Sequence, residues 1–188
     1  MHVGHHTFDA DGAAELEDAS KRYRRISEEE LLWALEPSSE TTVADLGSGT
    51  GFFTDVIAPV SGHVYAVDIQ EEMHEFYREK GVPENVDLVR SGIEELPFET
   101  DELNAALSTM TYHEFASEAA LEELRRVLVL DGKLVIFDWA ADGPGNAGPP
   151  VDERYNIDET TTKLNAAGFD VSFQAMRSDT FLVIASPD

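Results

Sequence analysis

The sequence predicts one α/β domain built on a doubly wound, mostly parallel sheet. Apolar stretches of strand length alternate with amphipathic helical stretches from residue 42 onward. Only the last two apolar stretches follow each other across a short polar turn, so only they form a hairpin. Strands joined through a helix run parallel, and a hairpin adds an antiparallel neighbour. We therefore expect a seven-stranded sheet with one antiparallel strand from the C-terminal hairpin.

Helix signals and turn residues set the boundaries of these elements. Ser27 and Glu30 are spaced as a capping box, and Pro37 ends the helix that they begin. The first 26 residues carry no clear pattern. The expected strands are Val43–Leu46, Val64–Val67, Val86–Val89, Ala105–Leu107, Lys133–Phe137, Phe169–Met176 and Thr180–Ala185. The helices between them are Phe52–Ala58, Glu71–Lys80, Ser117–Leu128 and Asp158–Ala167, and Asp131 with Gly132 forms a turn into the fifth strand.

The composition is extremely acidic, with 38 Asp and Glu against 13 Lys and Arg and a formal net charge of -25. The acids are spread along the chain, which favours adaptation to a salt-rich cytoplasm, as in a halophile, and argues against a nucleic-acid partner. There is no cysteine, so disulfides and thiolate metal sites are excluded. No apolar run is long enough for a membrane span, and the N-terminal residues lack a signal-peptide pattern. We therefore expect a cytoplasmic protein.

The stretch VADLGSGTGFF, residues 43 to 53, predicts a ligand-binding loop after the first strand. Its glycines are spaced G-x-G-x-G, which differs from the dinucleotide fingerprint, and it lacks the lysine of a nucleotide-triphosphate loop. Asp45 would repel a pyrophosphate and suit an ammonium group. Asp68, at the end of the second strand, is placed to accept hydrogen bonds from ribose hydroxyls. A ligand with a ribose, a cationic amine and no phosphate indicates S-adenosylmethionine (SAM).

Five stretches resemble the motifs of class I SAM-dependent methyltransferases of the small ubiquinone/menaquinone-biosynthesis-like type (methyltransferase type 11). VADLGSGTG resembles the first motif, VYAVDIQEEM the second, SGIEELPF the adenine-binding stretch, LNAALSTMTYHEF the fourth-strand motif and RRVLVLDGKLVIFDW the fifth. The resemblance covers roughly residues 40 to 186. It implies a Rossmann-like fold, SAM as the cofactor and transfer of its methyl group to a small-molecule acceptor.

The resemblance also implies which residues hold the cofactor. Together with Asp45, which would suit the ammonium group, the expected cofactor-binding residues are Asp45, Gly47, Ser48, Gly49, Gly51, Asp68, Ile69, Gly92, Ile93, Ser108 and Thr109. Gly92 stands where this family usually has an acid for the adenine amine, so that contact falls to backbone groups or Ser91. Asp68 could also cap the next helix, and the two roles are compatible.

His113, after the fourth strand, is the candidate catalytic base because its ordinary pKa suits proton transfer near neutrality. A structural or substrate-packing role for this histidine is the alternative. Glu114 is a further option for the base. Asp138 is the other, although a role in holding loop geometry suits it better, and Tyr112 could line the pocket.

Residues 1–39 are expected to form a helical cap or lid over a SAM-binding domain at residues 40–188. His5, His6 and Phe8 could close over the cofactor, and His2 with its neighbours could suggest a metal, although we expect none. The basic run KRYRR, residues 21 to 25, could receive an anionic substrate group or pair with nearby acids, and its tyrosine could touch the cofactor.

Two other functions remain open from sequence. A protein that binds SAM or its demethylated product without catalysis would carry the same cofactor motifs. A nicotinamide oxidoreductase is disfavoured by the glycine spacing and by Asp45. We expect a monomer or homodimer with no nucleic-acid or membrane partner.

Overall fold

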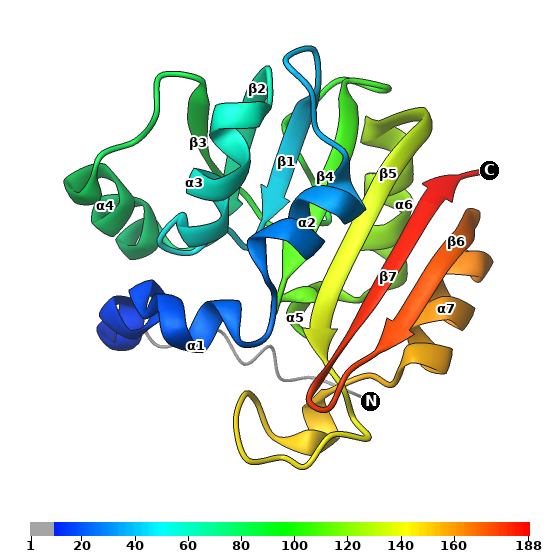
Figure 1. Ribbon diagram of the computed structural model, residues 1–188. Helices are drawn as coiled ribbons and strands as arrows, with labels where there is room; N and C mark the ends of the chain where they lie inside the picture. The colour runs from blue at the N-terminus through cyan, green and yellow to red at the C-terminus, as the bar shows by residue number, and fades with distance from the viewer. Residues whose placement is uncertain (1–9) are drawn as a thin grey trace.

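A computed structural model of the chain describes residues 10–188 and contains a seven-stranded sheet in the order β3-β2-β1-β4-β5-β7-β6 (Figure 1). The strands are β1 Thr42–Leu46, β2 His63–Asp68, β3 Val86–Arg90, β4 Leu103–Thr109, β5 Leu128–Trp139, β6 Phe169–Met176 and β7 Thr180–Pro187. The first five run parallel, and β7 runs antiparallel to both β5 and β6. The predicted doubly wound sheet with one antiparallel strand is confirmed.

Helices cover both faces of the sheet (Figure 1). The α-helices are α1 Ala19–Tyr23, α2 Glu28–Leu35, α3 Phe52–Ile57, α4 Glu71–Lys80, α5 Tyr112–Phe115, α6 Glu118–Val127 and α7 Ile157–Ala166, and the 3-10 helices are η1 Ala10–Glu17, η2 Ala58–Val60 and η3 Val151–Glu153. Buried side chains of α2, α3 and α4 pack on one face, and those of α5, α6 and α7 pack on the other. None of the described helices is long and apolar enough to cross a bilayer.

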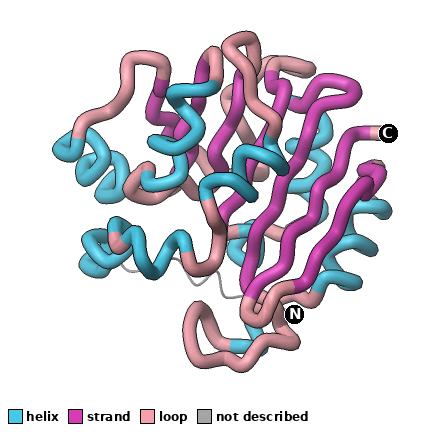
Figure 2. The backbone as a smooth tube through the Cα atoms, viewed as in Figure 1, coloured by secondary structure: helices cyan, strands magenta, loops and turns pink. Residues whose placement is uncertain are grey.

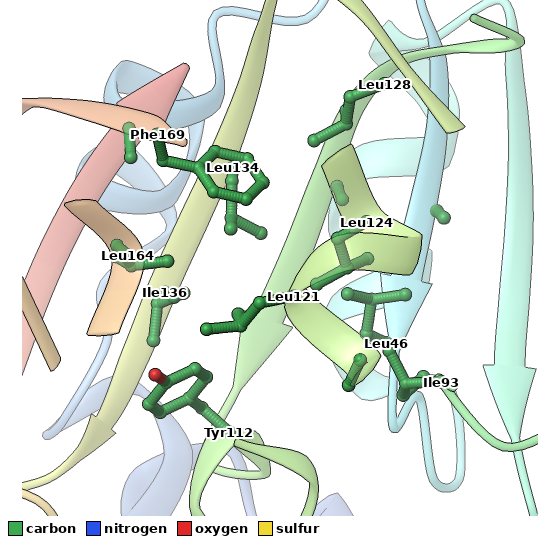
Figure 3. Packing of buried hydrophobic residues seen from close by; sticks show 14 of the residues in the cluster. Leu46, Ile93, Tyr112, Leu121, Leu124, Leu128, Leu134, Ile136, Leu164 and Phe169 are labelled. Atoms are coloured by element: carbon green, nitrogen blue, oxygen red, sulfur yellow. The ribbon is translucent and has the colours of Figure 1, made fainter. Parts of the chain in front are cut away.

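The two apolar layers fix the ends of the strands that carry the site. Figure 3 shows Leu121 and Leu124 of α6 between Leu46 of β1 and Ile136 of β5, and all four are almost fully buried. Burial of a leucine or isoleucine side chain contributes about 1.5–3 kcal/mol. This packing holds the carboxyl ends of β1, β4 and β5 in a rigid frame.

The order of the strands reverses at β1, which pairs in parallel with β2 on one side and β4 on the other. In open α/β sheets a ligand binds at such a point, outside the carboxyl ends of the strands. In Figure 2, α1 and the long loop between β5 and α7 lie beyond this edge of the sheet. The fold therefore places the glycine loop, the basic run and the Gly/Pro-rich loop around one crevice.

The structure differs from the predicted elements in three places. η1, α1 and α5 are short helices that the sequence pattern did not predict. β5 begins at Leu128, directly after α6, so the predicted turn at Asp131 and Gly132 is wrong. Asp131 instead has a positive φ of 67° inside the strand, where the pairing of β4 with β5 shifts register. A local irregularity of this kind has the same residue signal as a turn.

At the start of α2, the Ser27 half of the predicted capping box is present. The Ser27 hydroxyl accepts a hydrogen bond from the Glu30 amide at 3.2 Å, as an N-cap should. The Glu30 carboxylate lies 2.8 Å from the Arg177 guanidinium in the turn between β6 and β7. That ion pair ties α2 to the C-terminal hairpin.

Candidate functional site

The glycine loop turns sharply between β1 and α3. Gly47, Gly49 and Gly51 all have positive φ, at 71°, 54° and 79°. A Cβ atom on Gly51 would lie 2.2 Å from the Tyr77 ring, so only glycine fits there. The Gly47 and Ser48 amides both donate to the Val67 carbonyl, at 2.8 and 2.9 Å. These bonds hold the loop against the end of β2, next to Asp68.

Asp68 ends β2 and is half-buried beside the loop. Its Oδ2 accepts a hydrogen bond from the Gly49 amide at 2.8 Å, and its Oδ1 accepts one from the Gln70 amide at 2.9 Å. The second bond goes to the amide of Gln70, which is itself the N-cap of α4 and has no side-chain cap, so Asp68 does not cap this helix as the alternative prediction had it. Each carboxylate oxygen has a further lone pair that can accept from a ligand hydroxyl.

Asp45 lies behind the glycine loop and is fully buried. Its Oδ2 accepts a hydrogen bond of 2.6 Å from the Thr54 hydroxyl, while its Oδ1 is buried and has no hydrogen-bond partner among the described residues. Burial raises the pKa of this carboxyl from 3.8 to about 6, against the lowering effects of Thr54 and the Arg22 charge. A carboxylate with that pKa is charged at neutral pH, and it places a negative potential under the loop.

A cavity of about 930 Å³ opens at the carboxyl edge of the sheet, where the fold places the switch point. The predicted residues that line it are Gly47, Ser48, Gly49, Asp68, Ile69, Gly92, Ile93, Thr109, His113 and Glu114. Tyr112, which was predicted to line the pocket, is instead fully buried in the core. Three predicted cofactor residues, Asp45, Gly51 and Ser108, are not in its lining. The Ser108 hydroxyl, which is buried, lies 3.0 Å from the Thr111 hydroxyl. A second hollow of about 730 Å³ between α6 and α7 contains none of the predicted residues.

One end of the cavity is an apolar slot. The Ile69 side chain is 59% exposed, although it is large and apolar, and it lies in the cavity lining together with Met73 and Ile93. A Cβ atom on Gly92 would lie 4.0 Å from the tip of Ile69, so the two walls face each other. The Ser91 hydroxyl already bonds the Glu95 carbonyl at 2.8 Å, and it can still accept a hydrogen bond. A flat apolar ring with polar edges suits this end.

The other end contains a histidine and an aspartate in direct contact. His113 Nδ1 lies 2.9 Å from Asp138 Oδ1, and the His113 amide donates to Asp138 Oδ2 at 2.6 Å. The His113 side chain is only 6% exposed, and Asp138 is fully buried. A hydrogen bond from Nδ1 to the carboxylate leaves Nε2 as the unprotonated nitrogen of the neutral ring.

The pKa of His113 is raised above its ordinary 6.5. Burial alone would lower the pKa, but the hydrogen bond to Asp138 and the charges of Asp138, Glu114 and Glu153 outweigh it. The ring is therefore a stronger base than a free histidine, and the contact of Nδ1 with Asp138 fixes its orientation. Sequence reasoning favoured a loop-holding role for Asp138; the structure gives it direct contact with the His113 ring as well.

The Gly/Pro-rich loop forms part of the cavity wall, which the sequence left open. Residues 147–150 line the cavity with Trp139 of β5. The buried Arg154 guanidinium donates to the Pro149 carbonyl at 2.9 and 2.7 Å and also bonds the Ala147 carbonyl. Gly148 packs so closely on the Trp139 ring that a Cβ atom would lie 2.5 Å from it. Arg154 thus fastens the loop, and the sequence gave no signal for this long-range contact.

The segment before α2 forms another part of the cavity wall. Leu16, Lys21, Arg22, Arg24 and Arg25 line the cavity. Leu16 lies against Gly49, at 3.5 Å from where a Cβ would stand. The Thr50 hydroxyl donates to the Glu17 carboxylate, and Lys80 of α4 contacts the same carboxylate at 3.2 Å. These bonds fasten η1 onto the glycine loop and α4.

Arg22 packs on the aromatic residues that follow the glycine loop. Its guanidinium stands 4.7 Å from the centre of the Phe53 ring and 5.6 Å from that of Phe52. Burial lowers the pKa of Arg22 from 12.5 to about 10, so the group keeps its positive charge at neutral pH. Tyr23 packs on Phe52 at 5.3 Å between ring centres, and it is absent from the cavity lining.

Within residues 10–188, no group of three His, Asp or Glu side chains could hold a metal ion. The predicted lid residues His5, His6 and Phe8, and the histidine group around His2, lie outside the described residues.

Comparisons with known proteins agree with this geometry. A family model described as a methyltransferase domain matches residues 44–136. The chain superposes on the crystal structure of a SAM-dependent methyltransferase from Aquifex aeolicus with a TM-score of 0.86 and 30% identity, over 95% of this chain and 98% of that one.

Two curated relatives match over shorter stretches. An uncharacterized methyltransferase-like protein of Schizosaccharomyces pombe is 38% identical over 49% of this chain and 36% of its own length. A demethylmenaquinone methyltransferase of Clavibacter sepedonicus is 29% identical over 57% of this chain and 44% of its own length. The matched regions thus cover less than half of each of these relatives. Together with the full-length match to the Aquifex aeolicus enzyme, the fold and the site show that this chain belongs to the SAM-dependent methyltransferases.

Proposed function

We propose that the chain transfers the methyl group of SAM to a small molecule whose reacting atom must lose a proton, with His113 as the general base. The contact between His113 and Asp138 in the wall of the cavity carries this proposal. A base is needed only when the acceptor carries such a proton. A buried ring with a raised pKa and a carboxylate partner is suited to accept it.

In this proposal SAM lies along the cavity from the glycine loop to the apolar slot. Asp68 accepts hydrogen bonds from the ribose hydroxyls, and Ile69 and Ile93 sandwich the adenine ring. The exposure of Ile69 inside the cavity supports the adenine position. Arg22, a positively charged group beside the loop, binds the carboxylate of the methionine part of SAM. The negative charge of Asp45 attracts the ammonium group of the same part.

The chain's own residues then position the acceptor and move one proton. Bound SAM supplies an electrophilic methyl carbon on a sulfonium, which becomes a neutral thioether when the methyl group leaves. His113 Nε2 takes the proton from the acceptor atom that forms the new bond to carbon. Asp138 keeps the proton on Nδ1 and stabilises the imidazolium that results. The walls formed by residues 10–25 and 147–150 exclude water and hold the two reactants in line.

Residues 10–26 are proposed as the lid, since they contact the loop and α4, whereas α2 packs its buried residues into the core. We further propose that the chain belongs to the ubiquinone/menaquinone-biosynthesis-like branch of the family, which the matched demethylmenaquinone methyltransferase supports. The net charge of -25 supports a salt-rich cytoplasm as the working environment.

Replacement of His113 tests the proposal. His113→Asn should reduce kcat for methyl transfer by about 100-fold or more, because general-base catalysis contributes that much. Affinity for S-adenosylhomocysteine (SAH), the demethylated product, should stay within about twofold, measured by calorimetric titration. Acceptors are found with methyl-labelled SAM against a panel of phenols, carbon acids and amines.

The matched control is His63→Asn, because His63 is half-exposed, lies at the end of β2 opposite Asp68, and its side chain contacts Asp87 and Tyr65. This control should leave kcat and the affinity for SAH unchanged. If His113→Asn methylates the acceptor at the rate of the unaltered protein, His113 is not the base.

A further inference from the structure

The basic run at residues 21–25 concentrates positive charge at the cavity of a very acidic protein. Four of the 13 Lys and Arg residues of the chain lie in these five positions: Lys21, Arg22, Arg24 and Arg25. All four line the cavity. The remaining chain carries 38 acidic residues, so a local positive patch here contrasts with the field of the whole molecule.

The arginines of this run are not used in ion pairs, unlike most of the others. Within residues 10–188, no ion pair of 4.0 Å or less includes Arg22, Arg24 or Arg25. By contrast, Arg78 and Arg125 contact carboxylates at 2.7 and 3.2 Å. Pairing with surrounding acids, which the sequence left as an alternative role for this run, applies only to Lys21, at 3.8 and 3.9 Å from its two acids.

Arg25 is fixed in place at the catalytic end of the cavity. Its guanidinium lies 4.7 Å from the centre of the Trp139 ring, and its Nη1 donates to the Lys21 carbonyl at 3.0 Å. Trp139 directly follows Asp138, and its amide donates to Asp138 Oδ1 at 2.8 Å. Arg25 therefore contacts Trp139, which in turn is bonded to Asp138, the residue that orients His113. Arg24, next to it, is exposed at the cavity.

We propose that the methyl acceptor carries an anionic group, a carboxylate or a phosphate ester, that binds Arg24 and Arg25 while its reacting atom faces His113. This inference rests on the proposed function and names the class of its substrate. Arg22 lies at the Phe53 end and is kept for the cofactor, so the two arginines nearer Trp139 serve the acceptor. A guanidinium binds planar oxyanions through paired hydrogen bonds, and a stacked one loses little freedom in doing so.

The test titrates three phenols into the protein saturated with SAH at constant ionic strength. The probes are 4-hydroxybenzoate, 4-hydroxyphenyl phosphate and the neutral 4-hydroxybenzamide, measured by calorimetry. We expect at least one anion to bind with a dissociation constant in the millimolar range or below, at least tenfold more tightly than the amide. The two anions distinguish a carboxylate from a phosphate ester as the preferred group.

The double substitution Arg24→Gln with Arg25→Gln should weaken binding of that anion at least tenfold and leave amide binding and SAH affinity unchanged. The charge-matched control is Arg78→Gln with Arg125→Gln, since Arg78 on α4 and Arg125 on α6 do not line the cavity. Equal binding of amide and anions, anion binding that survives the double substitution, or no binding of either anion overturns the inference. If the unaltered protein does not bind SAH, the proposed function itself is overturned.

Discussion

At the scale of single residues, the proposed chemistry depends on how the surroundings of His113 set its basicity. Nδ1 of its ring contacts Asp138, and the Asp138 carboxylate also accepts from two backbone amides, His113 N and Trp139 N. The hydrogen bond to this carboxylate holds the ring in one tautomer, and together with the nearby carboxylate charges it raises the pKa of His113 against the effect of burial. Activity should be lost as the pH falls through that raised pKa, because the protonated ring cannot accept a proton.

Asp138→Asn should shift the acidic limb of the plot of kcat/KM against pH to lower pH. The substitution removes the charge that raises the pKa of His113, while the burial that lowers it remains. The maximal rate should also fall by about tenfold or more, because imidazolium stabilisation is lost. Asp87→Asn is the control, since Asp87 contacts the half-exposed His63, 3.1 Å away. A limb that stays in place or moves to higher pH would show that Asp138 does not set the basicity of His113.

At the scale of elements, the contacts of η1 support the proposal that the short helices before α2 form a lid over the glycine loop. Glu17 at the end of η1 accepts from the Thr50 hydroxyl and contacts Lys80 on α4, and Leu16 lies against Gly49. These contacts are half-buried, so they are stronger than pairs on the open surface. The sequence predicted a cap here but gave no periodic pattern for its helices. Asp18, which caps α1 by accepting from the Ser20 and Lys21 amides, was the one local signal available.

Glu17→Gln should increase the dissociation rate of SAH by about threefold, because the cover then opens more easily. Stopped-flow measurement of SAH release gives this rate. Glu71→Gln removes a similar contact to Arg78 on α4, away from the cavity, and should leave the rate unchanged. If release from Glu17→Gln is no faster than from the unaltered protein, η1 does not retain the cofactor.

At the scale of the whole molecule, the sequence predicted the sheet and the lining at the proposed cofactor end of the cavity better than the lining at the proposed acceptor end. The cofactor end is local in sequence, because Gly47, Gly49 and Asp68 sit at strand ends within a single β-α-β unit. The acceptor end joins Arg25, Trp139 and residues 147–150, which are far apart in the chain and meet only through the crossover connections. Alternation of strands and helices predicts which strand ends meet, but it does not predict such side-chain pairs.

The most direct test of the account is calorimetric titration of SAM, SAH and NAD into the unaltered protein and Asp68→Ala in molar KCl. The account predicts micromolar affinity for SAM and SAH, no binding of NAD, and at least tenfold weaker SAM binding by the variant, a loss of about 1.4 kcal/mol. Asp170→Ala, on the exposed side of β6, is the control. Binding of NAD without SAM, or unchanged SAM affinity in Asp68→Ala at an unchanged melting temperature, would contradict the proposed cofactor site.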